Sequence, residues 1–221
     1  MIVFNNANNI KEIHYQGHII KEVHNEIGKV WPESIVSLKF YATYTDSTTY
    51  SAACDSDTAL TSATTKAHTT SNTAMTTAEI GSCITSIGNR AFQYCTSLTS
   101  VTIPSSVTSI DNSAFDSCTS LTNIDIPSGV TSIGSSVFQG CTGLTSIVIP
   151  STMTLIGGYA FNNCRNLTSI TVKSTTPPTL GSSAFDSTNN CPIYVPPEAV
   201  ETYKAASGWS TYASRIYAIG T

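Results

Sequence analysis

Side chains that could coordinate a metal or act as acids and bases are scarce in this 221-residue chain. Three of its four histidines, His14, His18 and His24, stand close together near the N-terminus. Imidazole nitrogens bind zinc, but no carboxylate stands at a spacing that would complete such a site. We therefore interpret these histidines as solvated strand residues, and we predict no metal site and no cofactor.

A calcium site and a catalytic centre find no better support. Asp55 and Asp57 supply two carboxylates, whereas calcium takes about six to eight oxygen ligands, so we interpret them as turn residues. Between residues 84 and 176 the chain has neither His nor Glu, so its many Ser and Thr side chains lack a base to activate them. We predict that the protein is not an enzyme.

The cysteines indicate a repeat. Of the seven, four in the middle of the chain are separated by 23 residues each, namely Cys95, Cys118, Cys141 and Cys164. The same period carries one Phe, several Ile, Leu or Val and, in most units, one Pro. Zinc would need local Cys-x-x-Cys pairs, which are missing, so we expect a column of buried, reduced thiols.

Each unit is predicted to form one coil of a solenoid. Residues 98–104 alternate at their end, with Val101 and Ile103 inward and Thr102 outward, and stop at Pro104, which indicates a strand. Residues 107–110 form a second short extended piece, and a compact turn follows in which Phe and the Cys three residues later share the spacing of one helical turn. No coil can close a core alone, so stacking must bury the repeated apolar residues as ladders. The predicted fold class is an α/β repeat solenoid with short strands and single helical turns.

Two consecutive units, 110–127 and 133–150, resemble the BspA-like leucine-rich repeat. That repeat occurs in surface and adhesion proteins of gut and oral bacteria and of some protists. The resemblance covers about residues 80–196, and seven positions of each unit recur in register. It implies a leucine-rich-repeat solenoid used for binding, without indicating a ligand.

Two segments precede the solenoid. Residues 1–34 concentrate Lys, Glu and His, and we predict a small antiparallel β meander with turns at Gly17 and Gly28. This segment is similar to short N-terminal modules of virion proteins of gut phages and prophages, which implies attachment to a larger assembly. Residues 35–79 are predicted to form an N-terminal cap and connecting segment, with a strand through the alternating run 36–44 and a partly irregular Ser/Thr/Ala-rich stretch after it.

The solenoid itself is predicted over residues 80–196, and residues 197–221 are predicted to close it as a helical cap. A helix should begin near Pro197 and end near Gly208. It should be followed by Trp209, Tyr212 and Ile216 packed on the last coil.

Outward-facing positions on the predicted strands form the candidate binding row. They are small and weakly charged, so they could hydrogen-bond a glycan or a protein, or form only the solvated side of a sheet. Regular Thr arrays also suggest ice binding, but two interruptions in the row count against it. The row comprises Ser100, Thr102, Asn123, Asp125, Ser146, Val148, Ser169 and Thr171.

Charge and hydropathy narrow the function further. Charged residues make up 11% of the chain, against about 25% in a typical domain, and no Lys/Arg cluster exists to bind nucleic acid. No apolar run approaches the roughly 20 residues of a membrane span, and the N-terminus lacks the pattern of a signal peptide. We therefore expect a soluble recognition and adhesion protein on a virion surface, such as a phage fibre or decoration. The alternative is a BspA-like adhesin on a bacterial cell surface.

The expected partners follow from the segments. The solenoid would bind a host-surface protein or glycan, and residues 1–34 would join a larger assembly. A homo-oligomer is possible, whereas nucleic acid and membrane insertion are not expected.

Overall fold

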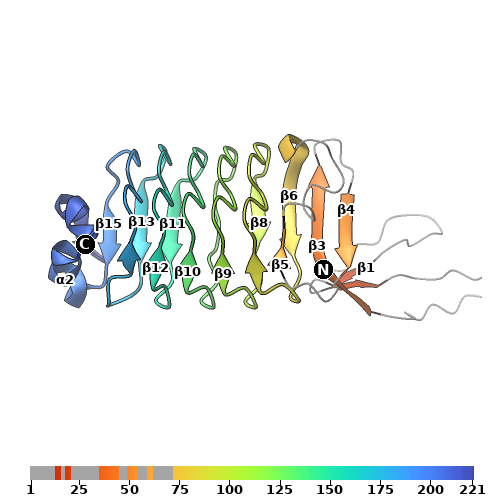
Figure 1. The fold of residues 1–221 in the computed structure, drawn as a ribbon, viewed down its shortest axis with the longest axis horizontal. Coiled ribbons are helices and arrows are strands. Elements are labelled where there is room, and N and C mark those ends of the chain that lie inside the picture. The colour runs from red at the N-terminus through yellow and green to blue at the C-terminus, as the bar shows by residue number, and fades with distance from the viewer. Residues whose placement is uncertain (1–12, 16–17, 21–34, 45–48, 54–58, 62–71) are drawn as a thin grey trace, which may run out of the picture.

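A computed structural model describes residues 13–15, 18–20, 35–44, 49–53, 59–61 and 72–221. These residues form a rod of stacked coils, with antiparallel strands at one end and short helices at the other (Figure 1). The coils follow the repeat of the sequence, and each contributes one layer of the rod. The predicted repeat solenoid is confirmed.

One side of the rod carries two stretches of parallel sheet, built from the first apolar run of each coil and separated by one coil that has no strand. Its strands are β6 (Met75–Ile80), β8 (Ser100–Thr102), β11 (Ser146–Ile149), β13 (Ser169–Val172), β15 (Ile193–Val195) and β16 (Ile216–Ala218). Residues one repeat apart are paired, so that Ile147 lies beside Ile170 and Ile170 beside Ile193. We call this side the long-strand sheet.

The coil between β8 and β11 departs from the prediction. Its residues 121–127 pass through the sheet position without forming a strand. Asn123 and Asp125, both outward-facing here, are residue types that strands disfavour. The predicted strand is therefore wrong at this coil, although Ile124 between them is still buried.

The second extended piece of each coil forms a second parallel sheet. Its strands are β5 (Ala59–Leu60), β7 (Ser86–Ile87), β9 (Ser109–Ile110), β10 (Ser132–Ile133), β12 (Leu155–Ile156) and β14 (Thr179–Leu180). Paired residues on neighbouring strands from β7 to β12 are 23 residues apart in the sequence. Leu155 of β12, however, pairs with Thr179 of β14, which is 24 residues further on. One residue has therefore been inserted between β13 and β14.

The third side of each coil consists of tight turns. Two positions in each coil have a positive φ, as at Arg90 (58°) and Tyr94 (63°). A right-handed helix cannot continue through such a residue, so the predicted helical turn is replaced by tight turns. Alternate N–H groups point to the following coil, and Phe92 N–H donates to the carbonyl of Ala114 over 2.7 Å. The same forward pattern continues from coil to coil, and its last bond joins Asn163 N–H to the carbonyl of Asp186.

Apolar ladders fill the interior between the three sides. Phe92, Phe115, Phe138, Phe161 and Phe185 are buried and stack on one another, with ring centroids 4.9 to 5.5 Å apart. The column of cysteines runs beside them and is likewise buried. The core is thus one continuous cluster along the rod.

The N-terminal strands continue the long-strand sheet with reversed direction. The alternating run predicted as a strand forms β3 (Ile35–Tyr44), which pairs antiparallel with β6 on one side and with β4 (Thr49–Ala53) on the other. β1 (Ile13–Tyr15) and β2 (His18–Ile20) form an antiparallel pair, and β2 pairs with the start of β3. The turns predicted at Gly17 and Gly28 lie outside the described residues.

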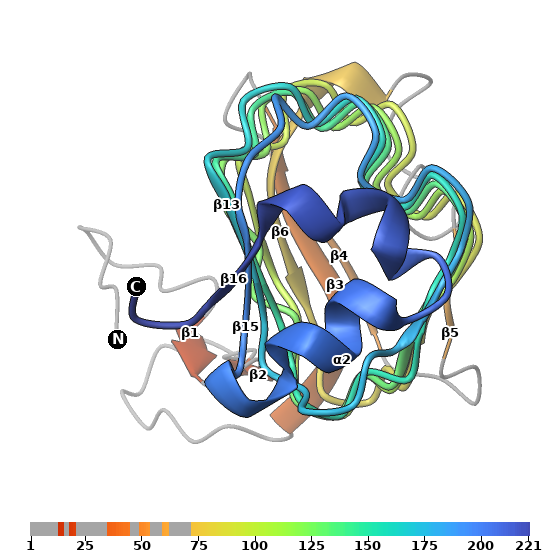
Figure 2. The ribbon, with the colours of Figure 1, turned by 90° about the vertical axis from the view of Figure 1, so that its left-hand side faces the viewer.

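Short helices close the other end of the rod. η2 (Pro197–Ala199), α2 (Val200–Ala205) and η3 (Trp209–Arg215) lie across the last coil (Figure 2). Tyr203, Trp209, Tyr212 and Ile216 are buried against it, as predicted for a cap. Near the other end, η1 (Asn72–Ala74) precedes β6. Within the described part of the chain no helix is long and apolar enough to cross a membrane.

Candidate recognition surface

The predicted binding row lies on the outer face of the long-strand sheet. Thr102, Asp125 and Val148 are exposed, and Thr171 is half-buried. The flanking residues Ser100, Asn123 and Ser146 are exposed, while Ser169 is half-buried. Val148 is an apolar side chain with 43% of its surface exposed. The sequence therefore placed these side chains on the correct face, although the row passes through a coil that lacks a strand at Asp125.

Two tyrosines extend this row, which the sequence reasoning missed. The sheet register places Thr171 beside Tyr194 and Tyr194 beside Tyr217. The two rings lie with their centroids 6.4 Å apart at 46°. Tyr217 is 48% exposed, and Tyr194 is half-buried. We call Val148, Thr171, Tyr194 and Tyr217 the tyrosine end of the row. The sequence held one signal: in Ile193-Tyr194-Val195 the two apolar residues are two apart and share the buried face, so Tyr194 between them must face outward.

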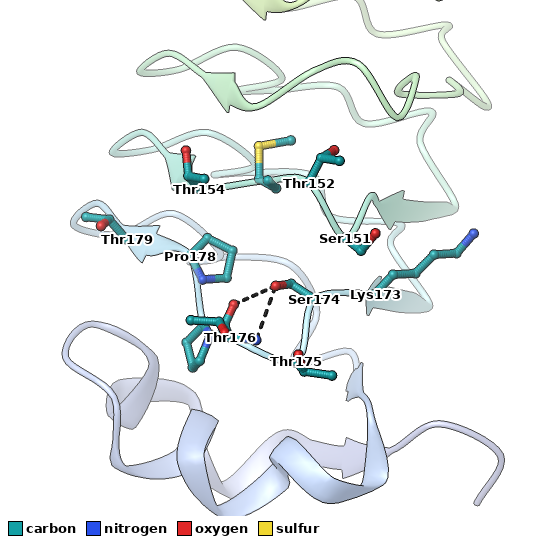
Figure 3. A pocket seen from close by; sticks show the side chains of 11 residues that line it. Ser151, Thr152, Thr154, Lys173, Ser174, Thr175, Thr176, Pro178 and Thr179 are labelled. Carbon is teal, nitrogen blue, oxygen red and sulfur yellow. Dashed lines mark hydrogen bonds between the residues drawn. The ribbon is translucent and has the colours of Figure 1, made fainter.

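Two hollows lie beside the row. The sheet hollow, of about 310 Å³, opens next to Asp125 and Val148, with Lys173 on its other side. The corner hollow, of about 480 Å³, lies between the end of β13 and the start of β14 (Figure 3). Lys173 and Ser151 line both hollows, so the two adjoin each other. The row, the sheet hollow and the corner hollow therefore make up one continuous outer surface.

A third hollow, of about 550 Å³, lies where the cap meets the last coil. Arg215 there donates to the carbonyls of Phe185 and Cys191 and to Thr188 Oγ1, while its guanidinium stacks over the Tyr212 ring. Burial lowers the pKa of Arg215 and raises that of Tyr212 to about 12. The donors of Arg215 already hold the last coil, so this arrangement is structural.

The cysteine column has the chemistry of protonated thiols. Burial raises the pKa of Cys164 to about 12 and holds the pKa values of Cys118 and Cys141 well above the ordinary range. Each thiol donates to a carbonyl of the preceding coil, as Cys141 Sγ does to Phe115 O over 3.2 Å. The prediction of reduced, buried thiols is confirmed for five cysteines.

Cys83 is different, because its sulphur forms a disulfide. The other cysteine of this bond lies outside the described residues. The prediction of a free thiol is therefore wrong at this position, where the first coil meets the N-terminal segment and the column of stacked copies has not yet begun.

Of the remaining candidate metal ligands, the structure describes His14 and His18. His14 and His18 lie on the adjacent strands β1 and β2, where His14 is paired with Ile19 and His18 with Tyr15. His24, Asp55 and Asp57 lie outside the described residues. Across the part of the chain that is described, no three His, Cys, Asp or Glu side chains are placed to hold a metal ion.

Stacked short strands, an Ile/Leu/Phe/Cys ladder and one tight turn per coil define a leucine-rich-repeat solenoid. Residues 63–192 match the family of BspA type leucine rich repeat regions in six copies. The chain belongs to this family.

Solved structures of leucine-rich repeat proteins from several bacteria are similar to this chain. A leucine rich cell surface protein from Faecalibacterium prausnitzii A2-165 is 21% identical, with a TM-score of 0.50 over 91% of this chain and 58% of that one. A leucine rich repeat protein of T. pallidum is 30% identical, with a TM-score of 0.46 over 52% of each chain. A leucine-rich repeat protein from Bacteroides ovatus is 25% identical, with a TM-score of 0.32 over 51% of this chain and 43% of that one.

The chain spans between 39% and 58% of the length of the solved structures that it matches. No curated protein matches it significantly.

Proposed function

We propose that this protein is a non-enzymatic recognition protein whose long-strand sheet binds a host-surface protein or glycan. The tyrosine end of the row carries this proposal. Exposed aromatic side chains supply large, rigid contact areas and are enriched where proteins bind partners. Here exposed Tyr217 and half-buried Tyr194 stand in register with a hydroxyl row on a sheet that a buried ladder supports. Hydroxyl groups beside an aromatic pair suit a ligand that offers both apolar faces and hydrogen-bonding groups.

The family and the low charge of the sheet both support recognition by shape and hydrogen bonding. Asp125 is the one charged residue among the eight predicted row positions. A ligand on this face would therefore be held with little dependence on salt, in contrast to a partner attracted by long-range charge.

We further propose that the protein acts at an exposed surface, on a virion as a fibre or decoration. The antiparallel strands β1 to β3 continue the sheet at the end opposite the helical cap, which supports attachment to a larger assembly through the N-terminal segment. The disulfide of Cys83 supports a location outside the reducing cytosol, as on virion and cell surfaces.

The alternative location is a bacterial cell surface, where the protein would serve as an adhesin. This reading is favoured by the fold it shares with the F. prausnitzii cell surface protein. Neighbouring genes for capsid or tail proteins would support the virion, whereas a signal peptide encoded upstream in the native gene would support the cell surface.

A binding experiment tests the recognition face. We expect a double variant, Tyr194→Thr with Tyr217→Thr, to lose at least about tenfold in binding to a glycan array or to host cells. Such a loss corresponds to about 1.4 kcal/mol, within the range for aromatic anchors. Threonine is the residue that the row carries at Thr171, so the sheet accepts it.

The matched control is Tyr159→Ser on the turn side of the rod. Tyr159 is 47% exposed and has a φ of 58°, while Ser136, its counterpart in the preceding coil, has a φ of 57°. The control removes an exposed tyrosine without touching the sheet. Binding that survives the double variant but is lost in Tyr159→Ser would place recognition on the turn side and refute the proposal.

A further inference from the structure

The corner hollow exists because the repeat is broken at one place. In the coils before it, the segment between the two sheets has five residues, Pro-Ser-Xaa-Val-Thr or Pro-Ser-Thr-Met-Thr, as in residues 104–108 and 150–154. In the last of these corners the sequence is Lys173-Ser-Thr-Thr-Pro-Pro178, one residue longer. The extra residue carries the loop 173–178 away from the preceding coil, and the hollow fills the space between them (Figure 3).

The side-chain hydrogen bonds that link two coils at the preceding corner have no counterpart across this hollow. At the preceding corner, Thr152 Oγ1 bridges to the carbonyls of Ser128 and Val130. On either side of the hollow, Lys173 N–H donates to Ile149 O and Thr179 N–H donates to Thr154 O. Between these two bonds, residues 174–178 donate no backbone hydrogen bond to the preceding coil. The carbonyls of Ser151 and Met153 are the equivalents of those of Ser128 and Val130, and among the described residues they accept no such bond from the next coil.

The walls of the hollow combine polar groups with an apolar floor. The hydroxyl groups of Ser151, Thr175 and Thr179 are exposed, while Met153 and Pro178 are buried beneath them. Lys173 is the one charged residue of the lining, and it is exposed. Its counterpart in each of the three preceding coils is an uncharged proline. The charge thus appears in the same coil as the insertion.

The cap holds the loop of this hollow in place. Tyr203 donates its hydroxyl proton to Ser174 O over 2.9 Å, and Trp209 Nε1–H donates to Pro178 O over 2.7 Å. Ser174 is 7% exposed, and its hydroxyl donates to Thr176 O and accepts from Thr176 N–H. The hollow is therefore formed before any ligand arrives, which avoids the cost of ordering a loop on binding.

We propose that the corner hollow binds a carboxylate-bearing sugar. The serine and threonine hydroxyls and the carbonyls would hold the ring hydroxyls, and the carboxylate would project over the rim to Lys173, whose side chain extends outward there (Figure 3). The volume of about 480 Å³ lies in the range of small-molecule sites, which is roughly 300–1,000 Å³. This inference rests on the proposed recognition function and assigns one ligand class to one part of that surface.

Methyl β-D-glucuronide and methyl β-D-glucoside provide a matched pair of probes, because they differ in the carboxylate alone. In an NMR titration of the whole chain, we expect glucuronide to shift the amide signals of residues 151–154, 173–176 and 179 saturably. We expect glucoside to bind at least about tenfold more weakly. Lys173→Met should reduce glucuronide affinity to the level of glucoside, whereas Lys204→Met, on the exposed face of the cap, should not change it.

A second variant tests the shape of the site without changing its charge. Thr179→Leu places in the hollow the side chain that the fold already carries at Leu155, its partner in the sheet. It should abolish glucuronide binding while the chain keeps its fold. Equal binding of the two sugars, unchanged binding in Lys173→Met, or the same shifts with sodium acetate would overturn the proposal. If the tyrosine double variant loses host-surface binding but glucuronide does not bind the corner hollow, the proposed function stands and the sugar site is refuted.

Discussion

Raising the pH from 8 to 10 should destabilise the folded chain through its cysteine column. A thiol in an unfolded chain has a pKa of about 8.5, whereas burial raises the pKa of Cys164 to about 12. Between these values the unfolded chain releases a proton that the folded chain keeps. The folded state then binds more protons, so its stability is complete below the unfolded pKa and falls as the pH rises towards the folded one.

The size of this effect follows from the two pKa values. Between pH 8 and pH 10, linkage at Cys164 alone removes about 2 kcal/mol of unfolding free energy. This figure hardly depends on the folded pKa, provided that it stays above the range studied. Burial raises the pKa values of Cys118 and Cys141 as well, so their contributions have the same sign. Together they approach the whole stability of a typical domain, which is roughly 5–15 kcal/mol.

Urea denaturation at pH 8 and pH 10, in oxygen-free buffer without reductant, measures this effect. Cys164→Ala gives the decisive comparison. The variant should be less stable at pH 8, because it loses a buried sulphur and its hydrogen bond to Phe138 O. When the pH is raised from 8 to 10, its unfolding free energy should fall by about 2 kcal/mol less than that of the natural chain. Titrations of Tyr and Lys are common to both chains and cancel. An identical pH dependence in the two chains would refute the reasoning.

Three substitutions test the packing of the rod by the same urea midpoints. Phe138→Leu removes two stacked ring contacts and should cost about 1–3 kcal/mol; no loss would mean that the rings contribute only as apolar volume. Gly157→Ala should cost at least about 1–3 kcal/mol, because an added Cβ would lie 2.4 Å from the carbonyl carbon of Gly134; a stable variant would show that the coils can separate. Tyr203→Phe leaves the carbonyl of Ser174 without its donor and should cost about 1–3 kcal/mol, with NMR signals of residues 174–178 shifted; unchanged loop signals would show that the cap does not hold the corner hollow.

The repeat made most of the solenoid predictable. A residue that recurs every 23 positions must meet its own copies, so its burial and register follow from the period alone. This is why Phe138, Cys141 and Ile147 could be assigned to the core without a structure. The cap was predictable for a related reason, because the last coil needs apolar side chains such as Trp209 to cover it.

The features that were missed lie where the period ends or breaks. Tyr194 and Tyr217 follow the last regular repeat, so no column of equivalents identified them as members of the row. The corner hollow depends on one inserted residue, which the sequence revealed as an irregular spacing. Its effect, however, depends on Tyr203 and Trp209 reaching the loop from the cap. The strand lost at Asp125 reflects local residue preference overriding the repeat.

The forward-pointing N–H groups of the turn side give the rod a direction. Every coil there offers donors to the coil after it and acceptors to the coil before it, as with Phe115 N–H and the carbonyl of Val137. At the last coil, Phe185 N–H meets the hydroxyl of Tyr212 in place of a carbonyl. Two rods brought together tail to tail would set donors against donors, so a symmetric end-to-end dimer is disfavoured at this side. A further coil added in the same chain direction would meet its neighbours through the same N–H to carbonyl bonds that join the existing coils.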